Sequence, residues 1–279
     1  VYKRQTLSGQ LKKLEDELGV SLFERTNRSV SITPIGELVL QHAKLMMEQA
    51  DAIVQISRAH NDPLAGPLRV GAIPTISPYL MPLILMPLKQ QYEQMRLVLQ
   101  EETTDHLVAE LQAHQLDVAI LGTSHSDPDL EEILLFDEPF WLAHPSDHEL
   151  YTKDEITRRD LKNLDLLILA EGHCLARQVM DVCRVDEQSL SEDTASLRAA
   201  SLETLLQLVS AGYGSTLVPA LTMQGAWMTG SGIIARKLDI NDAYRTVRLV
   251  FRKTFPRKQA IEVLADTIRK HLPNTVKRK

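Results

Sequence analysis

The chain has 279 residues, of which 44% are apolar and 24% are charged, a composition typical of a globular protein with about two domains. It contains no apolar run near the roughly 18 residues that a membrane-spanning helix needs, and no signal-peptide pattern. We therefore expect a cytoplasmic protein with no membrane partner. The net charge is −6, but residues 1–33 carry six Lys and Arg against four Asp and Glu, so a small basic segment precedes an acidic body.

The first five residues are unusual. Val-Tyr-Lys-Arg-Gln can be back-translated as GTG-TAT-AAG-AGA-CAG, which resembles the transposon-end adapter of sequencing libraries read in frame. We therefore expect that residues 1–5 are not native and that part of the native N-terminal segment is missing. Sequencing the genomic locus across this point tests that expectation.

A short helix followed by a hairpin is predicted over residues 6–33. The apolar positions of the helix recur at steps of four and three: Leu7, Leu11, Leu14 and Leu18. Gly19 follows as a C-cap, and extended pieces at 22–25 and 30–33 flank a polar tip. Such a helix and wing can present side chains to the grooves and phosphates of DNA. A helix and hairpin with no partner is the alternative.

The run from Thr6 to Val20, continued by 22–25 and by Thr33-Pro34-Ile35-Gly36, closely resembles the N-terminal signature of LysR-type transcriptional regulators. Gln5 departs from it, since the family usually has a proline there. The resemblance implies a partial winged helix-turn-helix DNA-binding domain at residues 1–33. The residues that it assigns to DNA contact are Thr6, Ser8, Gln10, Lys12, Arg25 and Arg28.

A long helix is predicted over residues 34–60. Thr33 is its N-cap, Pro34 takes the first helical position, and an apolar stripe with a spacing of about 3.5 residues runs from Ile35 to Ile56. Such a stripe needs a partner surface. The family resemblance implies that this is the dimerisation helix of a homodimer or homotetramer that binds an imperfect palindrome. Residues 61–67, with two prolines and a glycine, are the predicted hinge.

After residue 67, strands and helices alternate. We predict strands at 68–73, 95–100, 117–121, 164–170, 215–219 and 245–252, and helices from Ser77 and at 104–114, 201–211 and 259–272, with a crossover at 139–145. This pattern favours an α/β fold with a mostly parallel sheet. Two lobes joined by two crossovers resemble the periplasmic-binding-protein-like regulatory domain of LysR regulators. We assign 68–143 and 241–279 to lobe 1 and 144–240 to lobe 2.

Cys174 and Cys183 are the only cysteines. The residues between them are helix formers, and in one helix the two would be separated by about 2.5 turns and about 13.5 Å of rise, on opposite faces. A disulfide needs Cα atoms within roughly 7 Å, so bonding them would require this segment to unwind. Inert thiols are the commoner case in a reducing compartment, and the spacing alone leaves both interpretations open.

The runs Gly172-His173-Cys174-Leu175, 201–205 and 216–221 closely resemble the hydrogen peroxide sensors of the LysR family. The resemblance implies that Cys174 is the peroxidatic cysteine, oxidised first to a sulfenic acid, and that Cys183 is the resolving cysteine that completes the disulfide. It implies a transcriptional activator of antioxidant genes, not an enzyme, with DNA, RNA polymerase and hydrogen peroxide as partners and no cofactor. Ala176-Arg177 differs from the Arg-Asp expected at these positions.

Four further residues are predicted to bind the ligand. Ligands in such folds bind beyond the carboxyl ends of the strands, where Thr75 and Thr104 lie, although ordinary N-caps are the alternative for both. We predict that they orient peroxide together with His173, and that Arg245 adds positive charge. Cys174 stands at an expected helix start, which favours the thiolate. Oxidation would then remodel residues 171 to about 190 and change the spacing of the DNA-binding heads.

Three alternatives remain at this stage. The chain could be a LysR-type regulator that responds to a small organic effector bound between the lobes, with both thiols incidental. It could be a thiol peroxidase, although the DNA-binding signature argues against this. A metal site built from His173, Cys174 and Cys183 lacks a close fourth ligand and the spacing of zinc sites, so we predict no metal.

Overall fold

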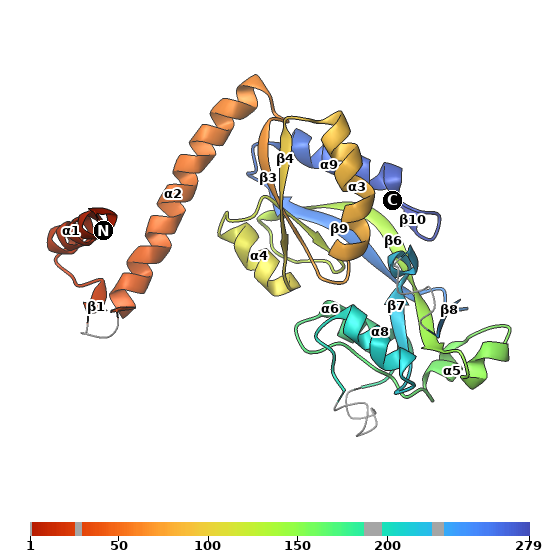
Figure 1. Ribbon diagram of the computed structural model, residues 1–279. Helices are drawn as coiled ribbons and strands as arrows, with labels where there is room; N and C mark the ends of the chain where they lie inside the picture. The colour runs from red at the N-terminus through yellow and green to blue at the C-terminus, as the bar shows by residue number, and fades with distance from the viewer. Residues whose placement is uncertain (1, 26–29, 187–196, 225–231) are drawn as a thin grey trace. The chain divides into compact units, whose positions relative to one another are not determined.

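The computed structural model describes residues 2–25, 30–186, 197–224 and 232–279 (Figure 1). The chain forms two compact units, Val1–Ser57 and Arg58–Lys279, called the N-terminal unit and the C-terminal unit below. In the described residues no helix has the length and apolar character needed to cross a membrane.

The N-terminal unit contains the predicted helix and wing. Helix α1 (Tyr2–Leu18) is followed by the antiparallel strands β1 (Phe23–Arg25) and β2 (Val30–Ile32). The Glu15 carboxylate accepts hydrogen bonds from the backbone N–H groups of Leu22 (2.7 Å) and Phe23 (3.1 Å), which ties the wing to the helix. The wing tip at 26–29, including Arg28, lies outside the described residues.

The long helix α2 (Pro34–Asn61) begins where the sequence predicts. The Thr33 hydroxyl accepts a hydrogen bond from the backbone N–H of Gly36 at 3.0 Å, as an N-cap does. Along the helix the apolar side chains of Leu38, Met46 and Ile53 are 55, 68 and 69% exposed. The apolar stripe of α2 is therefore not covered by other described residues.

One half of the C-terminal unit is built on a mixed sheet. Its elements are β3 (Gly66–Ala72), α3 (Ser77–Gln91), β4 (Met95–Glu101), α4 (Thr104–Gln112), β5 (Val118–Leu121), β6 (Leu130–Pro145), β9 (Tyr244–Arg252), α9 (Lys258–His271) and β10 (Lys277–Arg278). The strand order is β10-β6-β9-β5-β3-β4. Figure 1 shows α4 on one side of this sheet and α3 with α9 on the other.

The prediction of a mostly parallel sheet is wrong. Among the described strands only β3 forms parallel pairs, with β4 and β5, whereas β9 pairs antiparallel with both β5 and β6. The reason is topological: β6 leaves this half and β9 returns to it, so the two crossover strands run in opposite directions. Only β3, β4 and β5 are joined by the helical crossovers that parallel pairing requires.

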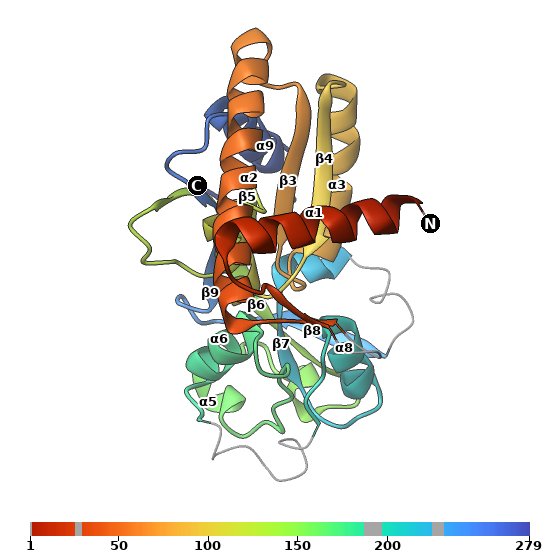
Figure 2. The same cartoon turned by 90° about the vertical axis from the view of Figure 1, so that its left-hand side faces the viewer.

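The other half of the unit is organised around the far end of β6. Residues 140–145 of this strand pair with β7 (Thr216–Pro219) and β8 (Ile233–Lys237), so the predicted crossover at 139–145 is part of one 16-residue strand. The helical elements here are η1 (Glu149–Thr152), α5 (Arg158–Leu161), α6 (Cys174–Cys183), α8 (Leu202–Ser210) and η3 (Ala220–Gln224). Figure 2 shows β6 and β9 extending between the half with α3 and the half with α6 and α8. The unit therefore has two lobes.

The predicted strand at 164–170 is also wrong. This buried apolar run makes only two isolated bridges, Leu166 with Ser215 and Leu169 with Ala199. A short apolar run indicates burial but does not by itself specify ladder pairing.

Candidate functional site

Both cysteines lie on one helix, as predicted. Helix α6 begins at Cys174 and ends at Cys183, and both thiols are free. Leu175, Val179 and Val182 form the buried face of the helix, at steps of four and three residues. Nine helical steps separate the two Cα atoms by about 13.5 Å, far beyond the roughly 7 Å that a disulfide allows. A bond between the thiols therefore requires α6 to unwind.

Cys183, the last residue of α6, is shielded from solvent. Its side chain is fully buried, and this burial raises the pKa of the thiol to about 12, although the nearby positive charge of Arg158 acts in the opposite direction. Arg184 is the C-cap of the helix, and its φ of 55° lies in the left-handed region, which costs a non-glycine residue roughly 1 kcal/mol. Residues 187–196 lie outside the described residues, so the segment predicted to remodel is described from 171 to 186 only.

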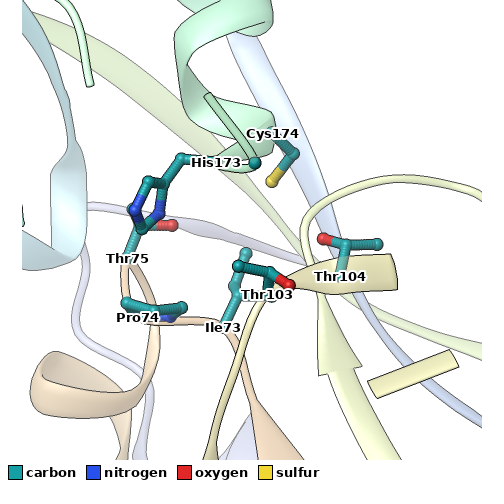
Figure 3. Close-up of a pocket in the computed structure, with 8 residues that line it drawn as sticks. Ile73, Pro74, Thr75, Thr103, Thr104, His173 and Cys174 are labelled. Atoms are coloured by element: carbon teal, nitrogen blue, oxygen red, sulfur yellow. The ribbon is translucent and has the colours of Figure 1, made fainter. Parts of the chain in front are cut away.

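Cys174, at the other end, lines a small pocket between the two lobes. The pocket is lined by Ile73, Pro74, Thr75, Thr103, Thr104, Gly172, His173 and Cys174. Its volume is about 10 Å³, close to the space that one water molecule occupies. Figure 3 shows the Cys174 sulfur pointing into the space between His173 and Thr104. The pocket therefore fits a ligand of very few atoms.

The structure brings three of the predicted ligand residues, Thr75, Thr104 and His173, to this pocket beside Cys174. The N-cap alternative does not apply to either threonine, because Ile76 is the N-cap of α3 and Thr103 is the N-cap of α4. The buried Thr104 hydroxyl has no hydrogen-bond partner among the described residues. A buried hydroxyl without a partner is costly, so a ligand that bonds to it would relieve that cost.

Arg245 does not line the pocket but lies behind Thr75. Its guanidinium donates hydrogen bonds to the Thr75 hydroxyl (2.8 Å) and to the Thr75 carbonyl (2.9 Å). It also forms a fully buried ion pair at 2.8 Å with Glu138, a residue that the sequence analysis did not predict. Because arginine can only donate, the Thr75 hydroxyl accepts this bond and keeps its own proton to donate elsewhere.

Two helices begin at the pocket. Thr104 is the first residue of α4, and Cys174 is the first residue of α6. The unpaired N–H groups and the dipole of a helix place partial positive charge at its N-terminus. Negative charge on the Cys174 sulfur, or on an oxygen that leaves a bound ligand, is stabilised there.

Further contacts between the lobes were missed by sequence reasoning. Gln178, one helical turn after Cys174, donates from Nε2 to the carbonyl of Gly122 at 2.7 Å, and its buried Oε1 has no partner among the described residues. Because residues four apart lie on the same face of a helix, the spacing of Gln178 from Cys174 could have identified it. The Tyr79 hydroxyl donates to Glu203 at 2.8 Å, and burial together with this bond raises the pKa of Tyr79.

The other predicted site residues divide into described and undescribed positions. Ser8 and Lys12 are exposed on α1, as is Gln10. The side chains of Thr6 and Arg25 lie outside the described residues. Across the described part of the chain, no group of three His, Cys, Asp or Glu side chains is arranged to bind a metal ion.

Comparison with known proteins defines the class. Residues 61–273 match the LysR substrate binding domain, and residues 2–37 match the bacterial regulatory helix-turn-helix protein of the lysR family. The chain belongs to the LysR family of DNA-binding transcriptional regulators. A hydrogen peroxide-inducible genes activator of Pectobacterium carotovorum subsp. carotovorum is 38% identical over 267 residues, which is 96% of this chain and 87% of the relative.

Solved structures point to the same members of the family. A full-length OxyR variant from Pseudomonas aeruginosa is 37% identical, with a TM-score of 0.76 over 96% of this chain and 89% of that chain. An OxyR mutant from Corynebacterium glutamicum with hydrogen peroxide bound is 36% identical, with a TM-score of 0.73 over 96% of this chain and 83% of that chain.

Proposed function

We propose that this protein is a hydrogen peroxide-sensing transcriptional activator of antioxidant genes, switched by a reversible disulfide between Cys174 and Cys183. The observation that carries the proposal is the position of Cys174. Its thiol lines a pocket of about 10 Å³ at the start of α6, and the second thiol stands at the other end of the same helix. The relatives named as peroxide-inducible genes activators support the same function.

In the first step the Cys174 thiolate attacks one oxygen of peroxide. An S–O bond forms, the O–O bond breaks, and the second oxygen leaves as hydroxide, which takes a proton to become water; sulfur is oxidised and peroxide is reduced. The Thr75 hydroxyl has a proton available to donate, and Thr104 and His173 lie beside it in the pocket. These groups orient peroxide, and the N-termini of α4 and α6 stabilise the leaving hydroxide.

In the second step Cys183 attacks the sulfenic acid of Cys174. The S–S bond forms, the S–O bond breaks, and the oxygen leaves as water with the proton of the Cys183 thiol. The step requires α6 to unwind, because the two residues occupy opposite ends of this helix. A cellular dithiol reductant returns the disulfide to two thiols.

The change in α6 reaches DNA through the rest of the chain. We propose a homodimer or homotetramer that pairs through the exposed apolar stripe of α2 and recruits RNA polymerase when oxidised. The proposed divisions are a DNA-binding domain at 1–33, a linker helix at 34–60, a hinge at 61–67, lobe 1 at 68–143 and 241–279, and lobe 2 at 144–240. The proposed DNA contacts are Thr6, Ser8, Gln10, Lys12, Arg25 and Arg28.

The size of the pocket disfavours an organic effector at this position. Pockets for small organic ligands have volumes of about 300–1,000 Å³, whereas the pocket at Cys174 has about 10 Å³. An effector of that size would require the lobes to separate, whereas peroxide would not.

Cysteine variants of the full chain test the proposal with a promoter-fusion reporter and mass spectrometry. We expect peroxide to produce a Cys174–Cys183 bridge and to induce the reporter in the wild type, and Cys174→Ser to abolish both. Cys183→Ser serves as the matched variant, because it should still form a sulfenic acid at Cys174 but no bridge. Induction of the reporter by peroxide in Cys174→Ser would reject the proposal.

A further inference from the structure

Glu138 is a buried charged residue at the point where the two lobes meet. On β6 it pairs in register with Arg245 on β9, and from Phe140 onward β6 pairs with β7 in the other lobe. Neither side chain of the Glu138–Arg245 ion pair is exposed to solvent. The pair therefore lies within the connection between the lobes and not on the surface of either one.

Both carboxylate oxygens of Glu138 are engaged. Oε2 accepts a hydrogen bond from Arg245 Nε at 2.8 Å and forms an ion pair with Arg245 Nη2 at 2.8 Å, and Oε1 accepts a hydrogen bond from the backbone N–H of Leu221 at 2.8 Å. The charge-assisted hydrogen bond and the ion pair together hold the guanidinium against the carboxylate. The backbone of Leu221, in η3, thereby holds the carboxylate through the oxygen that Arg245 does not contact.

The guanidinium in turn holds Thr75. Nη1 donates to the Thr75 hydroxyl at 2.8 Å and Nη2 donates to the Thr75 carbonyl at 2.9 Å. Thr75 is 2% exposed and lines the pocket beside Cys174. One chain of hydrogen bonds therefore runs from Leu221 through Glu138 and Arg245 to the hydroxyl that faces the pocket.

We propose that Glu138 is a positioning residue for the reaction of Cys174 with peroxide, acting through Arg245 on the orientation of the Thr75 hydroxyl. The inference rests on the proposed function. A contribution to folding stability does not account for such a pair, because well-packed apolar residues can replace a buried ion pair without loss of stability. Without the carboxylate, Arg245 would be a buried cation with no counter-charge, and it could not remain where it directs Thr75.

The test compares two reactions of the same thiol. In the full chain carrying Cys183→Ser, the rate of sulfenic acid formation at Cys174 is measured by dimedone trapping after peroxide addition. The rate of Cys174 modification by methyl methanethiosulfonate, a neutral reagent that needs the thiolate but no Thr75 hydroxyl, is measured in parallel. We expect Glu138→Gln to slow the peroxide reaction about tenfold, because a reacting group is misplaced, and to leave the methyl methanethiosulfonate rate unchanged.

The same strand pair supplies a matched control. Glu132 on β6 pairs with Arg248 on β9 at 2.8 Å, away from the pocket lining, so Glu132→Gln should change neither rate. Adding Glu138→Gln to Thr75→Ala should cause no further loss, because Glu138 acts through that hydroxyl. An unchanged peroxide rate in Glu138→Gln, a parallel fall in both rates, or additive losses with Thr75→Ala would each overturn the proposal.

A folding defect would not obscure the result. If Glu138→Gln shows no cooperative thermal unfolding, Glu138→Asp replaces it, because aspartate keeps the negative charge on a shorter side chain. Glu138→Asp should slow the peroxide reaction and leave the methyl methanethiosulfonate rate unchanged. The outcomes that would overturn the proposal are the same for this variant. Failure of the proposed function has a different signature. In that case Cys174 forms no sulfenic acid even when Glu138 is intact.

Discussion

The substitution Val179→Ala should make the Cys174–Cys183 disulfide harder to reduce. Val179 lies at the centre of α6 and is 2% exposed. Removing its two methyl groups costs the packed helix about 2 kcal/mol, the sum of about 0.8 kcal/mol for each group and a small cavity term. If the oxidised form has unwound this part of α6, only the reduced form loses that energy. For a two-electron couple, 2 kcal/mol corresponds to a reduction potential about 40 mV more negative.

The assay is a redox titration of the full chain against a glutathione or dithiothreitol buffer, read by alkylation and mass spectrometry. Val209→Ala is the matched control, since Val209 is fully buried on α8, outside the switch helix. It should destabilise both redox forms equally and leave the potential unchanged. An unchanged potential in Val179→Ala, with the reduced form measurably destabilised, would mean that Val179 stays packed after oxidation, and the reasoning would be refuted.

Three further outcomes follow from the geometry. In the reduced protein at neutral pH, alkylating reagents should modify Cys174 but spare Cys183 until urea unfolds the chain, because burial raises the pKa of Cys183 to about 12; modification of Cys183 in the folded protein would contradict this. Arg184→Gly should stabilise the reduced protein by about 1 kcal/mol in urea unfolding, since glycine adopts a left-handed φ without the penalty. Burial lowers the pKa of His144, whose Nδ1 bonds the carbonyl of Pro145 at 2.7 Å, so below the ordinary value of about 6.5 the unfolded chain binds a proton that the folded chain does not. Stability should therefore fall as the pH is lowered through about 6.5, and His144→Gln should reduce this pH dependence in urea unfolding.

Local features of the sequence predicted much of the fold. Helix formation depends on residues a few positions apart, so short sequence patterns can predict it. The structure contains the helix predicted from the apolar spacing of α1, the N-cap at Thr33 and the helix between Cys174 and Cys183. Thr75 and Thr104 could be assigned to the pocket because the carboxyl ends of neighbouring strands meet at one edge of a sheet.

What the sequence could not predict depends on contacts between distant segments. Glu138 and Arg245 are 107 positions apart. The spacing of residues along the chain does not reveal that two charged residues on the crossover strands form a buried ion pair. The prediction of a mostly parallel sheet was wrong about β9 for the same reason. Alternation of strands and helices indicates a parallel sheet, but it does not reveal which strand returns from the other lobe.

The energies of α6 limit how its switch can work. A disulfide that closes a ten-residue loop stabilises the bonded form by about 3 kcal/mol at most. Complete exposure of Leu175, Val179 and Val182, all buried in the reduced form, would cost about 1.5 to 3 kcal/mol for each side chain. Full exposure would therefore outweigh the stabilisation from the bond. The bond can offset exposure of one such side chain, as assumed for Val179 above, but the oxidised segment must rebury the remaining apolar surface in a new arrangement. The signal that reaches the other lobe is therefore a refolded surface and not a locally melted one.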